Sequence, residues 1–253
     1  MMLENWDGLL WLLLLLGPLL ILQRNLHRNI QAVFLLVTRR PDLSLAMFSL
    51  LFFPGVAIHE LSHYLAARIL GVTTGRFSLL PRALPNGRLQ LGFVETAKTD
   101  FIRDTLIGAA PLLVGGLFVT YAGLNRLGLD VVWDAVHSQN SANILTALKQ
   151  ISNQQDFWLW FYLLFTVSST MLPSASDRRA WPSFGIVIVI LLVMGLISGA
   201  GAWMMENLAP WFNSALRALD IVLVISSLFH LLLLPPVWVI RRLLEKLTGM
   251  QVT

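Results

Sequence analysis

Residues 53–71 read FPGVAIHELSHYLAARILG and place His59, Glu60 and His63 in a segment otherwise apolar enough to lie in a bilayer. Side chains four residues apart on a helix lie one turn above each other, so His59 and His63 can bind one metal ion through their imidazole nitrogens. Glu60 lies beside the same site, where its carboxylate can exchange protons with a water molecule. Polar groups at membrane depth are costly without partners, so this stretch predicts a functional zinc site with Glu60 as general base.

The composition indicates an integral membrane protein. Of the 253 residues, 56% are hydrophobic and 13% are charged, and the mean hydropathy is +0.70, outside the usual range of soluble domains. The net charge of +4 comes from short basic clusters beside apolar runs, a pattern that orients membrane helices and gives no case for nucleic-acid binding. Because the chain has no cysteine, disulfides and thiolate ligands are excluded, and a metal must be held by His, Asp or Glu.

Six apolar stretches are candidates for helices that cross a bilayer. They occupy residues 9–22, 43–70, 101–124, 157–172, 184–204 and 218–240. A shorter apolar piece at 30–37 is expected to lie at the membrane interface. We therefore predict an all-α polytopic membrane protein of about six transmembrane helices. It forms a single membrane domain, 1–253, in which a core at 43–181 is flanked by helices at 1–42 and 184–253.

A short β-hairpin is predicted directly after the motif helix, on its cytoplasmic side. Asn86-Gly87 stands between two strand-like pieces, 76–80 and 89–95, and this dipeptide tolerates the positive φ of a tight turn. A plain connecting loop is the alternative. An extended peptide could pair with the edge of such a hairpin by strand addition. The candidate substrate-binding residues on this edge are Leu89, Leu91 and Phe93.

The distribution of basic residues predicts the orientation of the helices. It places 71–104, 173–183 and the C-terminus on the cytoplasmic side, and the polar connection 125–156, with room for an amphipathic helix, on the other side. The first connection departs from this rule, because a motif helix that spans the bilayer leaves the arginines of residues 24–40 outside. The alternative is a re-entrant helix that breaks at Pro54-Gly55. The orientation of the N-terminus therefore stays open.

A catalytic zinc ion needs a third protein ligand besides two histidines, with the fourth position left to water. Asp177 is the leading candidate, because it follows a helix break at Pro173 and lies near the same membrane depth as the motif. The alternative for Asp177 is an ion pair with Arg178 or Arg179. The weaker candidates are acidic residues and histidines elsewhere in the chain: Glu95, Asp100, Glu206, His137 and His230.

HELSH on an early membrane helix, a hairpin after it and an Asp beyond a proline-broken helix together resemble the site-2 protease family of intramembrane zinc metalloproteases. The resemblance covers residues 53–181. It implies that His59, His63 and Asp177 are zinc ligands, that Glu60 is the general base and that the hairpin binds substrate near the cytoplasmic face. The family's second motif, Asn-x-x-Pro followed by Leu-Asp-Gly, appears here as Thr170-Met-Leu-Pro173 and Ser176-Asp177-Arg178, so its accessory asparagine has no counterpart.

The leading hypothesis is an intramembrane zinc metalloprotease that hydrolyses peptide bonds of membrane-embedded or membrane-associated substrates. Its expected partners are a membrane protein or peptide and the lipid bilayer, in a bacterial-type plasma membrane with the C-terminus in the cytoplasm. The alternative is a non-catalytic membrane protein with a structural or sensing zinc site, closed by a fourth ligand such as His230. A third hypothesis is another class of HExxH protease with Glu206 as third ligand. The substrate and the oligomeric state stay open.

Overall fold

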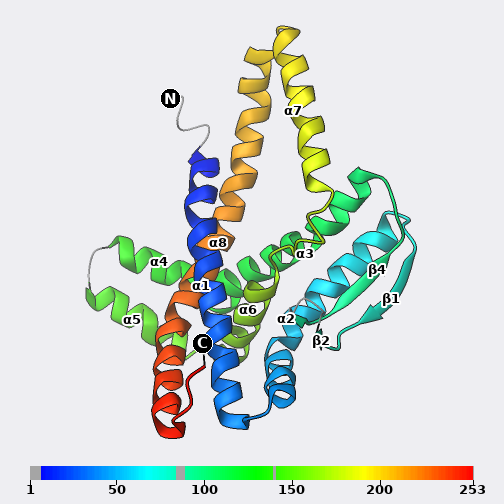
Figure 1. Cartoon of the computed structure of the whole chain (residues 1–253). Helices are drawn as coiled ribbons and strands as arrows, with labels where there is room; N and C mark the ends of the chain where they lie inside the picture. Colours follow the sequence, from blue (N-terminus) through cyan, green and yellow to red (C-terminus); the bar gives the residue numbers. More distant parts are fainter. Residues whose placement is uncertain (1–6, 84–88, 139–140, 253) are drawn as a thin grey trace.

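The structure, a computed structural model, describes residues 7–83, 89–138 and 141–252. Most of this part is helical, as predicted, and two short pairs of strands follow the second helix (Figure 1). The helices are α1 (Asp7–Thr38), α2 (Pro41–Ile69), α3 (Phe101–Thr120) with a π-helical continuation (Tyr121–Arg126), α4 (Leu129–His137), α5 (Ser141–Ser152), α6 (Phe157–Thr170), α7 (Trp181–Ile197) and α8 (Gly201–Thr248).

Four helices in the described part are long and apolar enough to cross a membrane. They are α1, α2, α3 with its continuation, and α8, with 32, 29, 26 and 48 residues. Each exceeds the length of about 20 helical residues that a bilayer core requires. α6 and α7 are apolar but shorter, with 14 and 17 residues. All six predicted apolar stretches are thus largely helical, and four helices satisfy the length criterion for crossing.

The strands lie between α2 and α3 in two antiparallel pairs. β1 (Thr74–Ser78) pairs with β4 (Phe93–Thr96), and β2 (Arg82–Ala83) pairs with β3 (Leu89–Gln90). The chain therefore runs out along β1 and β2 and returns along β3 and β4. The paired residues differ by a few positions from the predicted strands, and the predicted turn at Asn86-Gly87 lies outside the described residues.

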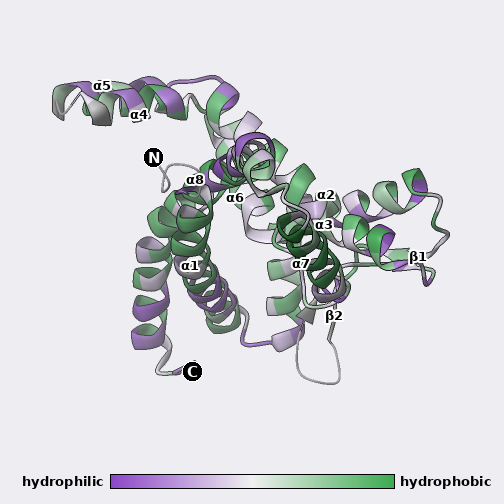
Figure 2. Ribbon diagram, turned by 90° about the horizontal axis from the view of Figure 1, so that it is seen from above, coloured by the Kyte–Doolittle hydropathy of each residue, from purple (hydrophilic) through white to green (hydrophobic). Residues whose placement is uncertain are grey.

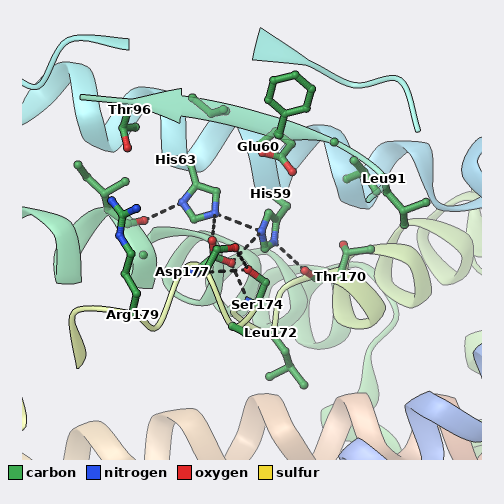
Figure 3. Close-up of a pocket in the computed structure, with 18 of the residues that line it drawn as sticks. His59, Glu60, His63, Leu91, Thr96, Thr170, Leu172, Ser174, Asp177 and Arg179 are labelled. Carbon is green, nitrogen blue, oxygen red and sulfur yellow. Dashed lines mark hydrogen bonds and ion pairs between the residues drawn. The ribbon is translucent and has the colours of Figure 1, made fainter. Parts of the chain in front are cut away.

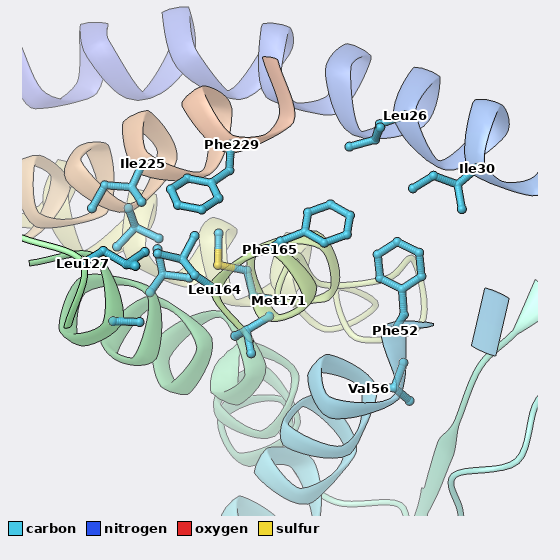
Figure 4. Close-up of a cluster of buried hydrophobic side chains, with 14 of the residues drawn as sticks. Leu26, Ile30, Phe52, Val56, Leu127, Leu164, Phe165, Met171, Ile225 and Phe229 are labelled. Atoms are coloured by element: carbon cyan, nitrogen blue, oxygen red, sulfur yellow. The ribbon is translucent and has the colours of Figure 1, made fainter. Parts of the chain in front are cut away.

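The hydrophobic core lies where α1, α2, α3, α6 and α8 meet (Figure 4). α1 runs beside α8 along much of its length (Figure 1), and hydrogen bonds join them near both ends. In a bilayer, close van der Waals contact holds helices together, because lipid is as apolar as the side chains themselves. The core therefore fixes α1 and α8 against the helices that carry the motif. Its buried side chains include Leu26, Phe52, Val119, Leu164, Phe165 and Phe229.

α1 continues through residues 30–37, so the prediction of a separate interfacial piece there is wrong. Leu26 and Ile30 are buried in the core, while Arg28 is exposed on the opposite side of the helix. This apolar stripe has helical spacing and packs against α2, which keeps the helix intact beyond the first apolar run. The helix ends only before Arg39, whose φ of 54° is left-handed.

α2 is one continuous helix, so the re-entrant alternative with a break at Pro54-Gly55 is wrong. The helix tolerates Pro54 because the loss of one backbone hydrogen bond bends a helix without ending it. Gly55 lies directly against α6, where an added Cβ atom would stand 2.3 Å from the backbone oxygen of Thr166. The glycine therefore permits a close crossing of α2 and α6 near the motif.

The predicted fifth span, 184–204, is not one helix, because α7 ends and α8 begins inside it. Gly199 has a φ of 83°, and the N–H of Ala200 donates to the Gly195 carbonyl, as in the glycine turn that ends many helices. The predicted sixth span, 218–240, is the middle of the 48-residue α8. α7 and the first part of α8 form a hairpin that stands away from the other helices (Figure 1), and α7 is strongly hydrophobic (Figure 2).

The polar connection 125–156 carries α4 and α5, which pack against each other and extend sideways from the other helices (Figure 2). Ala135, Ala147 and Ile151 are buried, while Trp133 and Leu148 are exposed. The connection is therefore a helical arm rather than an irregular loop.

Candidate metal centre

Three side chains from two distant parts of the sequence lie close together beside α2 (Figure 3). His59 and His63 lie one turn apart on this helix, and Asp177 reaches them from the segment between α6 and α7. The two imidazole Nε2 atoms are 3.2 Å apart. The Asp177 carboxylate oxygens lie 3.7 Å from Nε2 of His59 and 3.4 Å from Nε2 of His63. In the part of the chain that the structure describes, this group is the one whose ligand atoms lie close enough to share a metal ion.

These separations fit a tetrahedral metal ion. With metal–ligand bonds of about 2.0–2.1 Å, neighbouring ligand atoms of a tetrahedron stand about 3.3 Å apart. The observed values of 3.2, 3.4 and 3.7 Å lie close to this distance. Two imidazole nitrogens and a carboxylate oxygen form a donor set that suits zinc and leaves one position for water. The group can therefore bind a metal ion with little movement of its side chains.

Backbone carbonyls orient both imidazole rings. Nδ1 of His59 donates to the carbonyl oxygen of Thr170 at 2.7 Å, and Nδ1 of His63 donates to that of Ile107 at 2.8 Å. A proton on Nδ1 leaves the lone pair on Nε2, which is the nitrogen that faces the other ligands. The end of α6 and the second turn of α3 thus fix the tautomer that a metal ligand needs.

Asp177 is held by a local turn and by close contact with α3. The N–H of Ser174 donates to its carboxylate at 2.7 Å, and the N–H of Asp177 donates to Oγ of Ser174 at 3.3 Å. This reciprocal pair is the arrangement of a capping box. The same segment lies on Gly108, where an added Cβ atom would stand 1.9 Å from the Asp177 carbonyl oxygen. Only glycine leaves room for the segment at this place on α3.

The surroundings of Asp177 favour its ionised form. Burial raises the pKa of the carboxyl group, but the neighbouring imidazoles of His59 and His63 and a hydrogen bond with Ser174 outweigh burial and hold the pKa of Asp177 well below its ordinary range. An ionised carboxylate beside neutral imidazoles is the state in which these groups bind a cation.

The two arginines after Asp177 have other partners. Arg179 donates to both carboxylate oxygens of Asp104 on α3, each at 2.8 Å, and this ion pair raises the pKa of Arg179. Arg178 donates to the carbonyl oxygen of Ser174 at 3.3 Å. The bidentate ion pair ties the segment after Asp177 to the first turn of α3, so it supports the placement of the carboxylate toward the histidines.

Glu60 is buried beside the histidines and borders a pocket of about 690 Å³. Figure 3 shows it next to His59, below the strand that crosses the site. Gly92 lies against its side chain, because an added Cβ atom would stand 2.8 Å from Cγ of Glu60 and 3.0 Å from its Oε1. The carboxylate is therefore held between the motif helix and the returning hairpin segment, at the edge of the pocket.

The predicted hairpin edge forms one wall of this pocket. Leu91, which precedes β4, lines it together with Phe93 and the other residues of β4, whereas the side chain of Leu89 lies outside the described part. β4 pairs with β1 alone among the described strands, so no described strand pairs with its second edge. The pocket thus joins the candidate metal group, the Glu60 carboxylate and one strand of the hairpin.

The weaker ligand candidates lie elsewhere or have other roles. Asp100 caps α3 by accepting from the N–H groups of Ile102 and Arg103. Glu206 is exposed on α8. His230 is buried and engaged through both ring nitrogens, with Nδ1 donating to the Ser226 carbonyl and Nε2 facing Oγ of Ser169. The side chain of His137 lies outside the described part. Glu95 lines the pocket and accepts a hydrogen bond from the N–H of Arg76.

Sequence reasoning missed the groups that support the ligands. The carbonyls of Thr170 and Ile107 carry no sequence signal, because every residue has one. Gly108 was visible as part of a small-residue face for close packing on the third apolar stretch, but its contact with the Asp177 segment was not predicted, and Gly92 went unnoticed. Ser174-Ala-Ser-Asp177 was a usable signal, because a serine followed three residues later by an acid predicts a reciprocal cap.

In comparisons with known proteins, the chain matches no protein-family model, no curated protein and no solved structure.

Proposed function

We propose that the protein is an intramembrane zinc metalloendopeptidase that hydrolyses peptide bonds of membrane-embedded or membrane-associated substrates. The observation that carries this proposal is the meeting of His59, His63 and Asp177 at separations close to the edge of a zinc tetrahedron. Glu60 borders the same pocket, so a metal group and a proton-transfer group share one chamber. This combination is what hydrolysis of an amide by water requires.

Zinc fits the donor set better than other common ions. The sequence has no cysteine, and the group offers two imidazole nitrogens and one carboxylate, whereas magnesium and calcium prefer oxygen ligands alone. A zinc ion bound here supplies a Lewis acid that polarises a carbonyl and makes water more acidic.

The protein's own groups perform the proton transfers and the positioning. The Glu60 carboxylate takes the proton that the attacking water loses, and it delivers that proton to the amine nitrogen of the departing peptide half. Thr170 and Ile107 keep the imidazole rings in one orientation through their carbonyls. A transmembrane helix hides its carbonyls in its own hydrogen bonds, so the substrate must be extended locally, and the second edge of β4 can pair with it in that form.

We place all six apolar helical segments in the bilayer of a bacterial-type plasma membrane, with the C-terminus in the cytoplasm. The four long apolar helices support a membrane location, and the many exposed apolar side chains of α7 support its contact with lipid. Because the native chain has no cysteine, single cysteines can be placed in each connection and tested for labelling from either side.

A structural or sensing zinc site is the competing function, and it needs a fourth protein ligand. His230 was its candidate. Its hydrogen-bonding interactions with Ser169 and Ser226 leave it engaged away from the metal group, so no observation favours this function over hydrolysis.

The deciding experiment is a cleavage assay in liposomes with a model transmembrane peptide. The wild-type protein should cleave the peptide and lose activity when zinc is chelated. Glu60→Gln should keep zinc but lose about 10²–10⁴-fold in rate, because the general base is gone. Glu206→Gln is the matched control, since it makes the same change at an exposed position on α8 and should leave the rate unchanged. Cleavage that survives Glu60→Gln, or a wild-type protein without zinc, would refute the proposal.

A further inference from the structure

The last turn of α6 is bonded to two helices that lie outside the predicted core at 43–181. Gln23 of α1 donates from Nε2 to the backbone carbonyl oxygen of Ser169 at 2.5 Å. Nε2 of His230 on α8 lies 3.0 Å from the hydroxyl oxygen of the same serine. In the described part of the chain, these are the hydrogen bonds that join α1 and α8 to α6, and both end on Ser169.

The second ring nitrogen of His230 sets the direction of its bond with Ser169. Nδ1 lies 2.7 Å from the carbonyl oxygen of Ser226, one turn earlier on α8, and a carbonyl oxygen can only accept. In a neutral ring the proton is therefore on Nδ1, which leaves the lone pair of Nε2 to accept from the Ser169 hydroxyl. The imidazole thus has a fixed partner at each nitrogen and one orientation in the core.

Ser169 and Thr170 close α6, where backbone carbonyls have no partner inside the helix. The last carbonyls of a helix lack an N–H group one turn further on, so side chains can donate to them. The Ser169 carbonyl accepts from Gln23, and the next carbonyl, that of Thr170, accepts from Nδ1 of His59 at 2.7 Å. The turn that orients a candidate metal ligand is therefore the turn to which α1 and α8 are bonded.

The polar side chains at this turn do more than fill space. His230 is fully buried and Ser169 is 2% exposed, and apolar side chains would pack there without the cost of burying polar groups. Hydrogen bonds are directional, so a buried and satisfied pair fixes how two helices lie against each other. On the α2 side, a Cβ atom added at Gly55 would stand 2.5 Å from the Thr170 hydroxyl oxygen, so the turn has no room to move toward the motif helix.

We propose that Gln23 and His230 are positioning residues for the metal centre. Through Ser169 they hold the end of α6 at the place where the Thr170 carbonyl sets the orientation of His59. This inference rests on the proposed function through its metal site and does not depend on the hydrolytic step. It makes α1 and α8 part of the metal centre, although neither helix carries one of the three candidate ligands.

The test measures metal binding by the purified full chain in detergent micelles. Competition with a fluorescent chelator gives the zinc affinity, and the visible spectrum of bound cobalt(II) reports the arrangement of the ligands. His230→Leu and Gln23→Leu each remove one hydrogen bond to Ser169. Each should weaken zinc binding about two- to tenfold, the effect of one hydrogen bond, and alter the cobalt spectrum. His230→Gln keeps an acceptor for the Ser169 hydroxyl, so it should recover most of the affinity and the wild-type spectrum.

Leu216→Ala is the control for a general loss of stability. Leu216 is a buried residue of α8 that lies against Gly8 of α1, about four helical turns from His230. Its truncation should lower the thermal midpoint but leave the zinc affinity and the cobalt spectrum unchanged.

Wild-type affinity and spectrum in His230→Leu or in Gln23→Leu would overturn the role of that residue. The inference would also fail if Leu216→Ala changed metal binding as much as these variants do, or if His230→Gln bound zinc no better than His230→Leu. Should His230→Leu not fold, Ser169→Ala removes the same hydrogen bond from the α6 side and should show the same loss. A wild-type protein that binds neither metal would refute the proposed function, and this inference with it. Metal binding by the wild type and equally tight binding by the variants would refute this inference alone.

Discussion

The candidate metal centre and the α7–α8 hairpin are built in contrasting ways. At the metal centre the backbones approach so closely that a Cβ atom added at Gly55 or Gly108 would overlap backbone atoms of the neighbouring segment. In α7 no residue is buried, and Gly185 has open space around it. A helix that is apolar on all sides and touches little protein is suited to lipid. The site therefore depends on close geometry, whereas α7 depends on hydrophobicity, and the same substitution should have different effects in each.

The largest difference is expected when a ligand is removed. His63→Ala deletes one of the three proposed protein ligands, so the purified protein should fall from about one zinc ion per chain to nearly none. Val189→Ala on α7 shortens an exposed apolar side chain and should leave the zinc content unchanged. Metal analysis after gel filtration measures both. Full zinc in His63→Ala would mean that this histidine does not bind the metal.

A glycine-to-alanine pair sharpens the comparison. Gly108→Ala must push the Asp177 segment away from α3, because the new Cβ atom would overlap the Asp177 carbonyl oxygen. We expect zinc affinity to fall about 10–100-fold, the range seen when groups that position a ligand are changed. Gly185→Ala meets no neighbouring atom and should be neutral or slightly stabilising through helix propensity. Competition with a fluorescent chelator measures both affinities, and equal affinities would show that the close approach at Gly108 is unimportant.

A smaller effect is expected from the ion pair between Arg179 and Asp104. Both hydrogen bonds are 2.8 Å long, but the Arg179 side chain is 58% exposed, so solvent weakens the interaction. A double-mutant cycle with Arg179→Gln and Asp104→Asn should give a coupling of about 0.2–1 kcal/mol in unfolding free energy. A coupling of zero would show that the pair does not help to hold the segment that carries Asp177.

The smallest effect is expected at Asp100, which caps the N-terminus of α3. This helix also carries Asp104, the partner of Arg179. The backbone N–H of Arg103 is the main cause that lowers the pKa of Asp100. A carboxyl group whose pKa is lower in the folded state stabilises the protein above its ordinary pKa of about 4, and this stabilisation is lost as the pH falls. The difference in thermal midpoint between the wild type and Asp100→Asn should therefore stay nearly constant down to about pH 5 and shrink as the pH is lowered from about 5 to about 3. A difference that stays constant with pH would contradict this.

The lengths of the apolar stretches predicted much of the fold. The errors of that prediction share one physical cause. The length of an apolar stretch predicts where a helix lies but not where it ends, because helix ends depend on packing and on single residues in turns. α1 passes through residues 30–37 because Leu26 and Ile30 pack against α2, which the sequence does not reveal. The break at Gly199 was visible as Ser-Gly-Ala-Gly, but the apolar residues on both sides outweighed it.

The part of the site that lies on one helix could be predicted from the spacing of its residues. His59, Glu60 and His63 follow from helical periodicity, whereas Asp177 was supported by its place after Pro173 and by the family resemblance. The carbonyl acceptors could not be predicted, because they depend on tertiary contacts. The bonds of Gln23 and His230 to Ser169 belong with them, since they form only through the packing of α1 and α8 on α6.

The central claim is that two imidazoles and a carboxylate hold a zinc ion with one position open to water. X-ray absorption at the zinc edge of the purified Glu60→Gln protein tests it most directly. The account predicts a four-coordinate ion with two imidazole nitrogens and two oxygens at about 2.0 Å, one of the oxygens from Asp177 and one from water. A shell with three or four imidazoles, or a protein that takes up no zinc, would contradict it.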